Sequence, residues 1–123
     1  MSDVGAVFRR YLEAWNETDP QRIRSLLAEC VSLDVVFADP AQRVVGPDAL
    51  AAWIEQTHRD IAGAKFLQVT PVDGGHDNRY RVRWEVRVGD ELFIEGMDFS
   101  TLDDEGMLCR IDGFFNDFPP RSP

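Results

Sequence analysis

Residues 31–40 read VSLDVVFADP, and in this stretch the chain changes from helical to strand spacing. Apolar residues alternate with the others at a period of two, which predicts a strand over residues 31–38. The apolar side of this strand consists of Val31, Leu33, Val35 and Phe37. Asp39 continues the same side, immediately before Pro40. A carboxylate therefore stands at the end of an apolar strand face.

Upstream of this strand, apolar residues recur at helical spacing. Residues 4–17 form an amphipathic pattern with one aromatic face, on which Tyr11 and Trp15 lie one turn apart. This pattern predicts a first helix that presents aromatic side chains to the protein interior.

Two further helices are predicted to begin at prolines. Asp19-Pro20 combines an N-cap residue with a first-turn proline and predicts a short second helix that ends near Cys30. Gly46-Pro47-Asp48 predicts the start of a third helix, which Gly63 closes.

From Lys65 onward, strand patterns alternate with turn signals, which predicts a four-strand meander. The order helix, helix, strand, helix and four strands is typical of the α+β class, with helices on one side of an antiparallel sheet. We expect one domain over residues 1–118 and a disordered, proline-rich tail over residues 119–123.

The charge balance narrows the classes of partner. The 123-residue chain carries 13 basic and 22 acidic residues, a formal net charge of −9. Such a field repels polyphosphate, so we expect neither nucleic acid nor an anionic membrane as a partner. Three Trp, two Tyr and eight Phe supply enough large apolar surface to line a pocket as well as fill a core.

The cysteines indicate neither a metal site nor a disulfide framework. Cys30 and Cys109 lack CxxC or Cys/His spacing, so we expect no metal and a reducing, cytoplasmic environment. No stretch approaches the roughly 18 apolar residues of a membrane span, and the N-terminus lacks the apolar segment of a signal peptide.

A second carboxylate lies within a strand pattern. Asp98 alternates with Ile94, Gly96 and Ser100, whereas the opposite side carries Phe93, Met97 and Phe99. The pattern alone favours the aromatic side as the core face. An ionised, unpaired carboxylate on an apolar face costs several kcal/mol, so Asp39 and Asp98 both require an explanation.

Four segments resemble the nuclear transport factor two-like superfamily, which includes the ketosteroid isomerases and SnoaL-like polyketide cyclases. They are residues 10–19, 36–40, 96–100 and 106–115. The resemblance covers nearly the whole chain and implies a cone-shaped fold, in which a strongly curved sheet wraps against three helices around an apolar pocket. It also implies that Asp98 faces the pocket and that Phe93, Met97 and Phe99 face outward.

The ketosteroid isomerases hold two carboxylates in different protonation states, and their pattern implies roles for three residues here. Asp39 corresponds to the base, and Tyr11 and Asp98 to the donors that hold an oxyanion. The reaction would be proton transfer at a carbon next to a carbonyl, without a cofactor. Trp15 lies where it would fill space that a steroid ring needs, which disfavours a steroid substrate.

The pocket is expected to bind a small, apolar, carbonyl-bearing ligand. The expected lining residues are Trp15, Phe37, Trp53, Trp84, Ile111 and Phe115. Two functions remain open: an isomerase-like or cyclase-like enzyme, and a non-catalytic binding protein. Because Asp-Pro after a strand is also typical of a turn, Asp39 is interpreted either as a desolvated, poorly paired base or as a turn residue. The outward apolar side chains predict a homodimer through the outer sheet face.

Overall fold

The structure of the protein is a computed structural model, and it describes residues 3–115. The predicted tail over residues 119–123 lies outside this range. The described residues form three helices, α1 (Val4–Asn16), α2 (Pro20–Ala28) and α3 (Pro47–Asp60). The strands are β1 (Val31–Ala38), β2 (Arg43–Val45), β3 (Ala64–Gln68), β4 (Asp73–Gly74), β5 (Arg79–Val88), β6 (Glu91–Leu102) and β7 (Leu108–Phe115), and a 3-10 turn, η1 (His76–Asn78), precedes β5.

The helix boundaries follow the local signals in the sequence. Pro20 and Pro47 occupy the first turns of α2 and α3, where a missing backbone N–H costs nothing. Gly46 has φ 92°, a conformation that glycine adopts without strain, and this lets the chain turn from β2 into α3. The three predicted helices and the strand over residues 31–38 are confirmed.

The sheet is mixed rather than antiparallel throughout, which corrects the sequence prediction. Its strand order is β2-β1-β7-β6-β5-β3, with β4 paired to β5. Every pair is antiparallel except β1 with β7. After β1 the chain runs through α3 and the meander before β7 returns beside it, a long connection of the kind that parallel pairing requires. The α+β class itself is confirmed.

The apolar side of β1 contains one exception to the predicted alternation. Leu33 is 90% exposed, whereas Val31, Val35 and Phe37 are buried. The register between β1 and β7 shifts between Val31 and Val36, and an irregularity of this kind changes which face the intervening residues present. The assignment of Leu33 to the buried side was therefore wrong.

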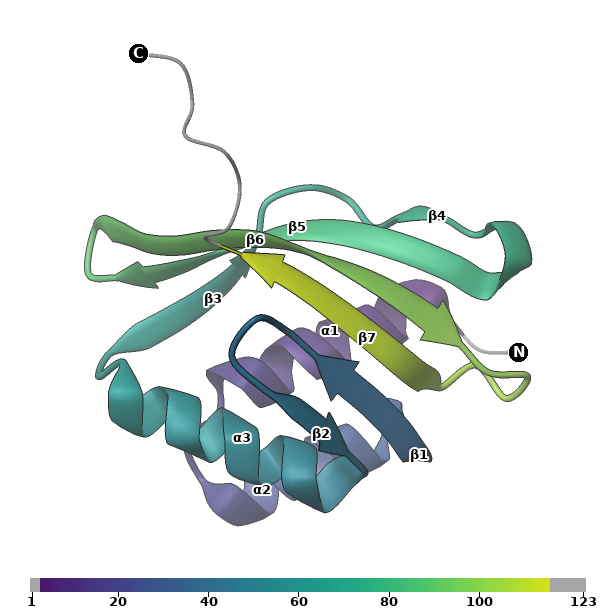
Figure 1. The fold of residues 1–123 in the computed structure, drawn as a ribbon, viewed down its shortest axis with the longest axis horizontal. Helices are drawn as coiled ribbons and strands as arrows, with labels where there is room; N and C mark the ends of the chain where they lie inside the picture. Colours follow the sequence, from purple (N-terminus) through teal and green to yellow (C-terminus); the bar gives the residue numbers. More distant parts are fainter. Residues whose placement is uncertain (1–2, 116–123) are drawn as a thin grey trace.

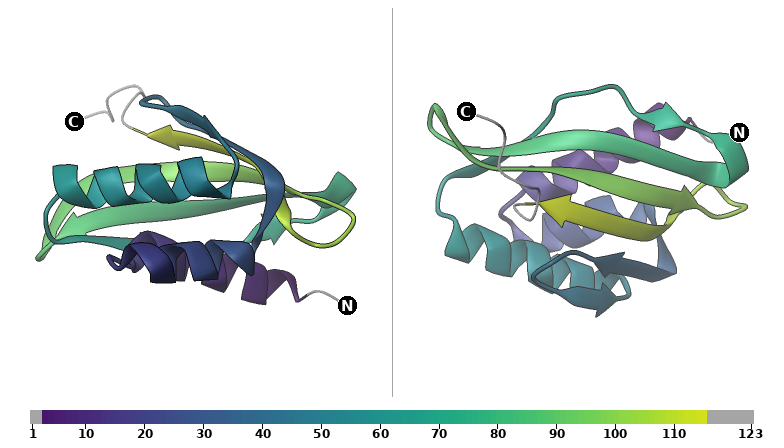
Figure 2. Two further views of the ribbon diagram at one scale, coloured as in Figure 1. Left: turned by 90° about the horizontal axis from the view of Figure 1, so that it is seen from below. Right: turned by 45° about the horizontal axis from the view of Figure 1, so that its top comes forward.

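All three helices pack against one face of the sheet, which curves around them to give the cone-shaped fold (Figures 1 and 2). The largest fully buried side chains come from both layers and from both ends of the chain: Ile23, Leu27, Leu50, Ile54, Leu108 and Ile111. These residues form the core. A cavity can form beside this core, on the concave face of the sheet.

The outer face of the sheet carries exposed aromatic side chains. Phe93 and Phe99 on β6 are 57% and 43% exposed, and Phe114 on β7 is 50% exposed. Phe99 and Phe114 meet edge to face, with ring centroids 5.8 Å apart. The face assignment that the superfamily resemblance implied is thus correct, and the assignment favoured by apolar alternation alone is not.

Candidate functional site

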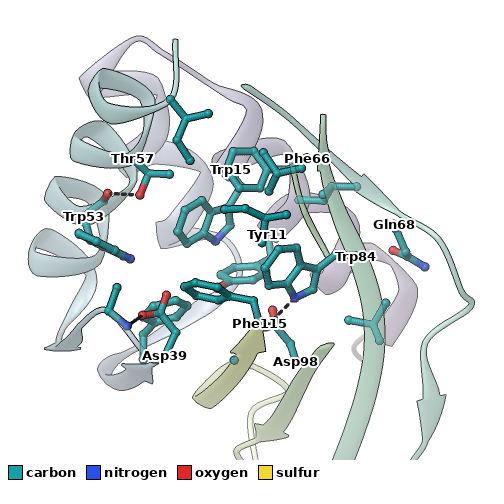
Figure 3. Close-up of a pocket in the computed structure, with 18 of the residues that line it drawn as sticks. Tyr11, Trp15, Asp39, Trp53, Thr57, Phe66, Gln68, Trp84, Asp98 and Phe115 are labelled. Carbon is teal, nitrogen blue, oxygen red and sulfur yellow. Dashed lines mark hydrogen bonds between the residues drawn. The ribbon is translucent and has the colours of Figure 1, made fainter. Parts of the chain in front are cut away.

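A cavity of about 210 Å³ lies between α1, α3 and the concave face of the sheet (Figure 3). Its walls are mostly apolar and include eight of the nine side chains expected at the site: Tyr11, Trp15, Phe37, Asp39, Trp53, Trp84, Asp98 and Phe115. The structure therefore brings both candidate carboxylates and the candidate tyrosine hydroxyl to one cavity.

Ile111 is the expected lining residue that does not line the cavity. Its side chain is fully buried within the core cluster. Ile111, Gly113 and Phe115 alternate along the inward side of β7, but only Gly113 and Phe115 lie where the cavity is open. Ile111 points inward, as expected, but it packs against other core side chains instead of lining the cavity.

Asp98 projects from β6 into the cavity and is held by the neighbouring strand. The indole N–H of Trp84 on β5 donates a 2.9 Å hydrogen bond to Oδ1 of Asp98. Burial raises the pKa of the Asp98 carboxyl to about 7, the negative charges of Asp39 and Asp112 contribute to the rise, and the Trp84 bond opposes it. Near neutral pH, Asp98 is therefore present in both its protonated and its ionised form.

Asp39 lies at the end of β1 and closes a backbone turn. Its Oδ1 accepts hydrogen bonds from the backbone N–H of Ala41 at 2.8 Å and of Gln42 at 2.9 Å. Burial raises the pKa of Asp39, although these two bonds and the Trp53 indole oppose the rise. The expectation of a poorly paired carboxylate was wrong for Oδ1, because this oxygen caps the turn that leads into β2.

Gly113 leaves the space between the two carboxylates open. A Cβ placed on Gly113 would lie 2.9 Å from Oδ1 of Asp98 and 3.4 Å from Cβ of Asp39. Any larger residue on this side of β7 would therefore push against Asp98. The sequence pattern did not predict this role of Gly113. The available signal was its phase, because Gly113 alternates with Ile111 and Phe115 along one side of β7.

Two polar atoms at the cavity are buried and have no hydrogen-bond partner in the described part of the chain. They are the hydroxyl of Tyr11 on α1 and the indole N–H of Trp53 on α3. Burial and the nearby Asp98 charge raise the pKa of Tyr11, so its hydroxyl keeps its proton and remains a donor. The Trp53 N–H is directed toward Asp39 without meeting hydrogen-bond geometry (Figure 3).

Residues 3–115 contain no group of three His, Cys, Asp or Glu side chains arranged to hold a metal ion. Within the same range, no helix is long and apolar enough to cross a membrane.

Comparisons with known proteins agree with this architecture. A sequence model of the SnoaL-like domain family matches residues 8–111. A proposed isomerase of the SnoaL-like family from Agrobacterium tumefaciens str. C58 superimposes with a TM-score of 0.85 and 29% identity, over 94% of this chain and 99% of that chain. No curated protein matches the sequence.

Two more distant structures share the fold. A nuclear transport factor two-like protein of unknown function from Exiguobacterium sp. 255-15 gives a TM-score of 0.73 at 19% identity, over 91% of this chain and 99% of that chain. A proposed polyketide cyclase from Sinorhizobium meliloti gives 0.62 at 20% identity, over 87% of this chain and 92% of that chain. The superfamily resemblance inferred from the sequence is confirmed.

Proposed function

Because the chain belongs to the SnoaL-like domain family, we propose that it is a cofactor-independent enzyme that transfers a proton at a carbon next to a carbonyl group. The observation that carries the proposal is the pair Asp39 and Asp98, which both line one apolar cavity and flank Gly113. Catalysis requires both groups within reach of one ligand, and their place on one cavity supports this role.

Tyr11 and protonated Asp98 are assigned as the donors that hydrogen-bond the carbonyl oxygen of the ligand. Removal of a proton from the neighbouring carbon moves negative charge onto this oxygen, and donors in an apolar, water-poor site stabilise that charge strongly. The raised pKa of Asp98 supports this role, since it keeps a fraction of the carboxyl protonated near pH 7. The Tyr11 hydroxyl is buried and has no acceptor within the described residues, which supports a hydrogen bond to a bound ligand.

Asp39 is assigned as the base. Backbone bonds at Oδ1 fix the orientation of the carboxylate, which leaves Oδ2 to take the proton. The carbon–hydrogen bond breaks, its electron pair forms the enolate, and the proton moves to Asp39. When the proton on Asp39 is first replaced from solvent, its return to the same carbon gives hydrogen exchange. In a ligand whose enolate is conjugated with a carbon–carbon double bond, return to the far carbon gives isomerisation. A raised pKa makes Asp39 a stronger base than an exposed aspartate.

The structural relative with 29% identity, a proposed isomerase, supports the reaction class. The proposed polyketide cyclase, at 20% identity, shares the fold alone and carries no weight in the choice of reaction.

A second function, a non-catalytic binding protein, is favoured by one observation. The two backbone bonds to Oδ1 of Asp39 give this residue a structural task that requires no chemistry. In that case the apolar cavity would hold a ligand without converting it.

Hydrogen exchange of a one-ring ketone separates the two functions. Acetophenone is incubated with the protein in D₂O, and the loss of its methyl proton signal is followed by NMR. The enzyme proposal predicts exchange faster than in buffer and a return to the buffer rate in Asp39→Asn. A ketone that binds and shows no accelerated exchange would establish the binding protein instead.

The remaining partner assignments are part of the same proposal. Cys30 and Cys109 are both free, which supports a reducing compartment such as the cytoplasm. The net charge of −9 disfavours nucleic acid and anionic membranes. The exposed aromatic side chains on the outer sheet face support a homodimer.

A further inference from the structure

The volume of the cavity limits the size of its ligand. About 210 Å³ is below the roughly 300–1,000 Å³ typical of pockets for drug-sized ligands. This volume favours a single ring with short substituents over a fused four-ring skeleton.

The cavity has one donor more than a lone carbonyl needs. Tyr11 on α1 and Trp53 on α3 each carry a buried donor that has no acceptor among the described residues. A buried donor left unpaired costs about 1–3 kcal/mol, so native proteins rarely keep two in one cavity without a use. The proposed function uses the Tyr11 hydroxyl and leaves the Trp53 N–H unexplained.

Each cavity carboxylate stands beside one indole N–H, but the two indoles differ. Trp84 bonds Asp98 at 2.9 Å and is satisfied. Trp53 faces Asp39 and affects its pKa, yet among residues 3–115 its N–H meets no acceptor in hydrogen-bond geometry, neither oxygen of Asp39 included. Because Oδ1 of Asp39 is occupied by two backbone donors and Oδ2 is not bonded by Trp53, the indole N–H is left to bond a ligand atom beside Asp39.

We infer that Trp53 binds a second oxygen acceptor of the ligand, so that the ligand is a one-ring ketone with another ether or carbonyl oxygen away from its reacting carbonyl. This inference rests on the proposed function for the position of the reacting carbonyl at Tyr11 and Asp98. Trp53 is then a positioning residue, since its bond fixes which carbon of the ligand faces Asp39. Both donor atoms are shielded from water, so binding also requires the side chains that cover them to shift.

Three pairs of ligands test this inference by binding rather than turnover. Each pair is a methoxyacetophenone and the ethylacetophenone with the same ortho, meta or para substitution, which differ by one oxygen in place of a methylene. Affinity is measured by titration of the ¹⁵N-labelled protein, whose three tryptophans give separate indole N–H signals. The Trp53→Phe variant identifies the Trp53 signal.

The expected result is that at least one methoxy isomer binds about tenfold more tightly than its ethyl partner. The same ligand should shift the Trp53 indole proton downfield. In Trp53→Phe the preference should disappear, whereas Phe115→Leu, which changes a wall of the cavity without removing a donor, should weaken both members of the pair alike.

Equal affinities within all three pairs, an unmoved Trp53 signal on saturation, or no binding of any of the six ligands would overturn the inference. These results leave the proposed function separately testable, because acetophenone exchange does not need a second acceptor. Conversely, a methoxy preference that depends on Trp53 without any proton exchange would support the second acceptor and contradict catalysis.

Discussion

The indole N–H of Trp84 donates a 2.9 Å hydrogen bond to Oδ1 of Asp98 across the antiparallel pair β5 and β6. In this register Trp84 pairs with Gly96, and a Cβ on Gly96 would lie 2.4 Å from the Trp84 ring. The glycine thus makes room for the indole to lie over β6 and reach Asp98. One oxygen of Asp98 is fixed in this way, and the proposed function assigns the other to the proton that bonds the ligand.

The partly buried Asp98 makes the stability of the protein depend on pH. Its pKa is about 7 in the folded chain against an ordinary value of 3.8, so the folded state holds the proton more tightly than the unfolded state. Unfolding free energy should therefore fall as pH rises from about 4 to about 7 and then level off. The shift amounts to a few kcal/mol, at about 1.4 kcal/mol per pKa unit.

Thermal melts of the wild type and Asp98→Asn across this pH range check the prediction. Asparagine keeps the acceptor for Trp84 and does not ionise, so the variant should gain stability relative to the wild type with rising pH. A constant difference between the two proteins from pH 4 to pH 8 would show that Asp98 titrates normally.

Two substitutions test how much the hydrogen bonds of Asp39 stabilise the turn after β1. Asp39→Ala removes the acceptor for Ala41 and Gln42 and should lower stability by about 0.5–2 kcal/mol, as the loss of a comparable cap does. Asp39→Asn keeps an oxygen acceptor and should retain most of this stability. Denaturant unfolding measures both. Equal losses in the two variants would mean that the turn needs the negative charge and not merely the acceptor.

A methyl group at Gly113 should lower activity rather than prevent folding. In Gly113→Ala the new Cβ presses on Oδ1 of Asp98, while the backbone conformation suits alanine. We expect a folded protein whose ketone exchange falls at least tenfold. Gly5→Ala on α1, whose Cβ would meet the flexible end of Arg9, is the matched control and should keep full exchange. Undiminished exchange in Gly113→Ala would show that the space between Asp39 and Asp98 is not needed for the reaction.

The outer sheet face should form a dimer interface. Phe99 and Phe114 meet there and are about half exposed in the single chain. Light scattering at tens of micromolar should give twice the 14.0 kDa of one chain, and Phe99→Lys should restore the single mass. Leu33→Lys, at an even more exposed apolar residue on β1, should leave the dimer intact. A wild-type monomer under these conditions would exclude this interface.

The helices and β1 could be predicted because their signals are local. Asp19-Pro20 and Gly46-Pro47 mark helix starts within a few residues, and the change of period at Val31 marks the strand. The parallel pairing of β1 with β7 left no such local signal, because its register depends on contacts between residues far apart in the chain. The exposure of Leu33 follows from the shift in that register and was missed for the same reason.

Most of the residues that line the cavity could be predicted from the sequence, but their hydrogen bonds could not. The apolar alternation predicted that Phe93 and Phe99 face the core, whereas the superfamily resemblance predicted that Asp98 faces inward. The alternation failed because this sheet also carries apolar side chains on its outer face. The two backbone bonds of Asp39 depend on the path of the chain after Pro40, which the residue pattern does not specify. Nor does that pattern reveal that the Trp53 N–H has no partner among the described residues, since this depends on packing between α3 and the sheet.

The pH dependence of acetophenone proton exchange tests the central claim most directly, because it reports the base and the donor in one profile. After subtraction of the buffer rate, the account predicts a bell-shaped profile that rises as Asp39 ionises and falls above about pH 7 as Asp98 loses its proton. In Asp98→Asn the fall above pH 7 should vanish, because an amide remains a donor at every pH. A protein-dependent rate that is absent, or that climbs steadily with pH in both proteins, would contradict the claim that Asp39 and Asp98 act together on one ligand.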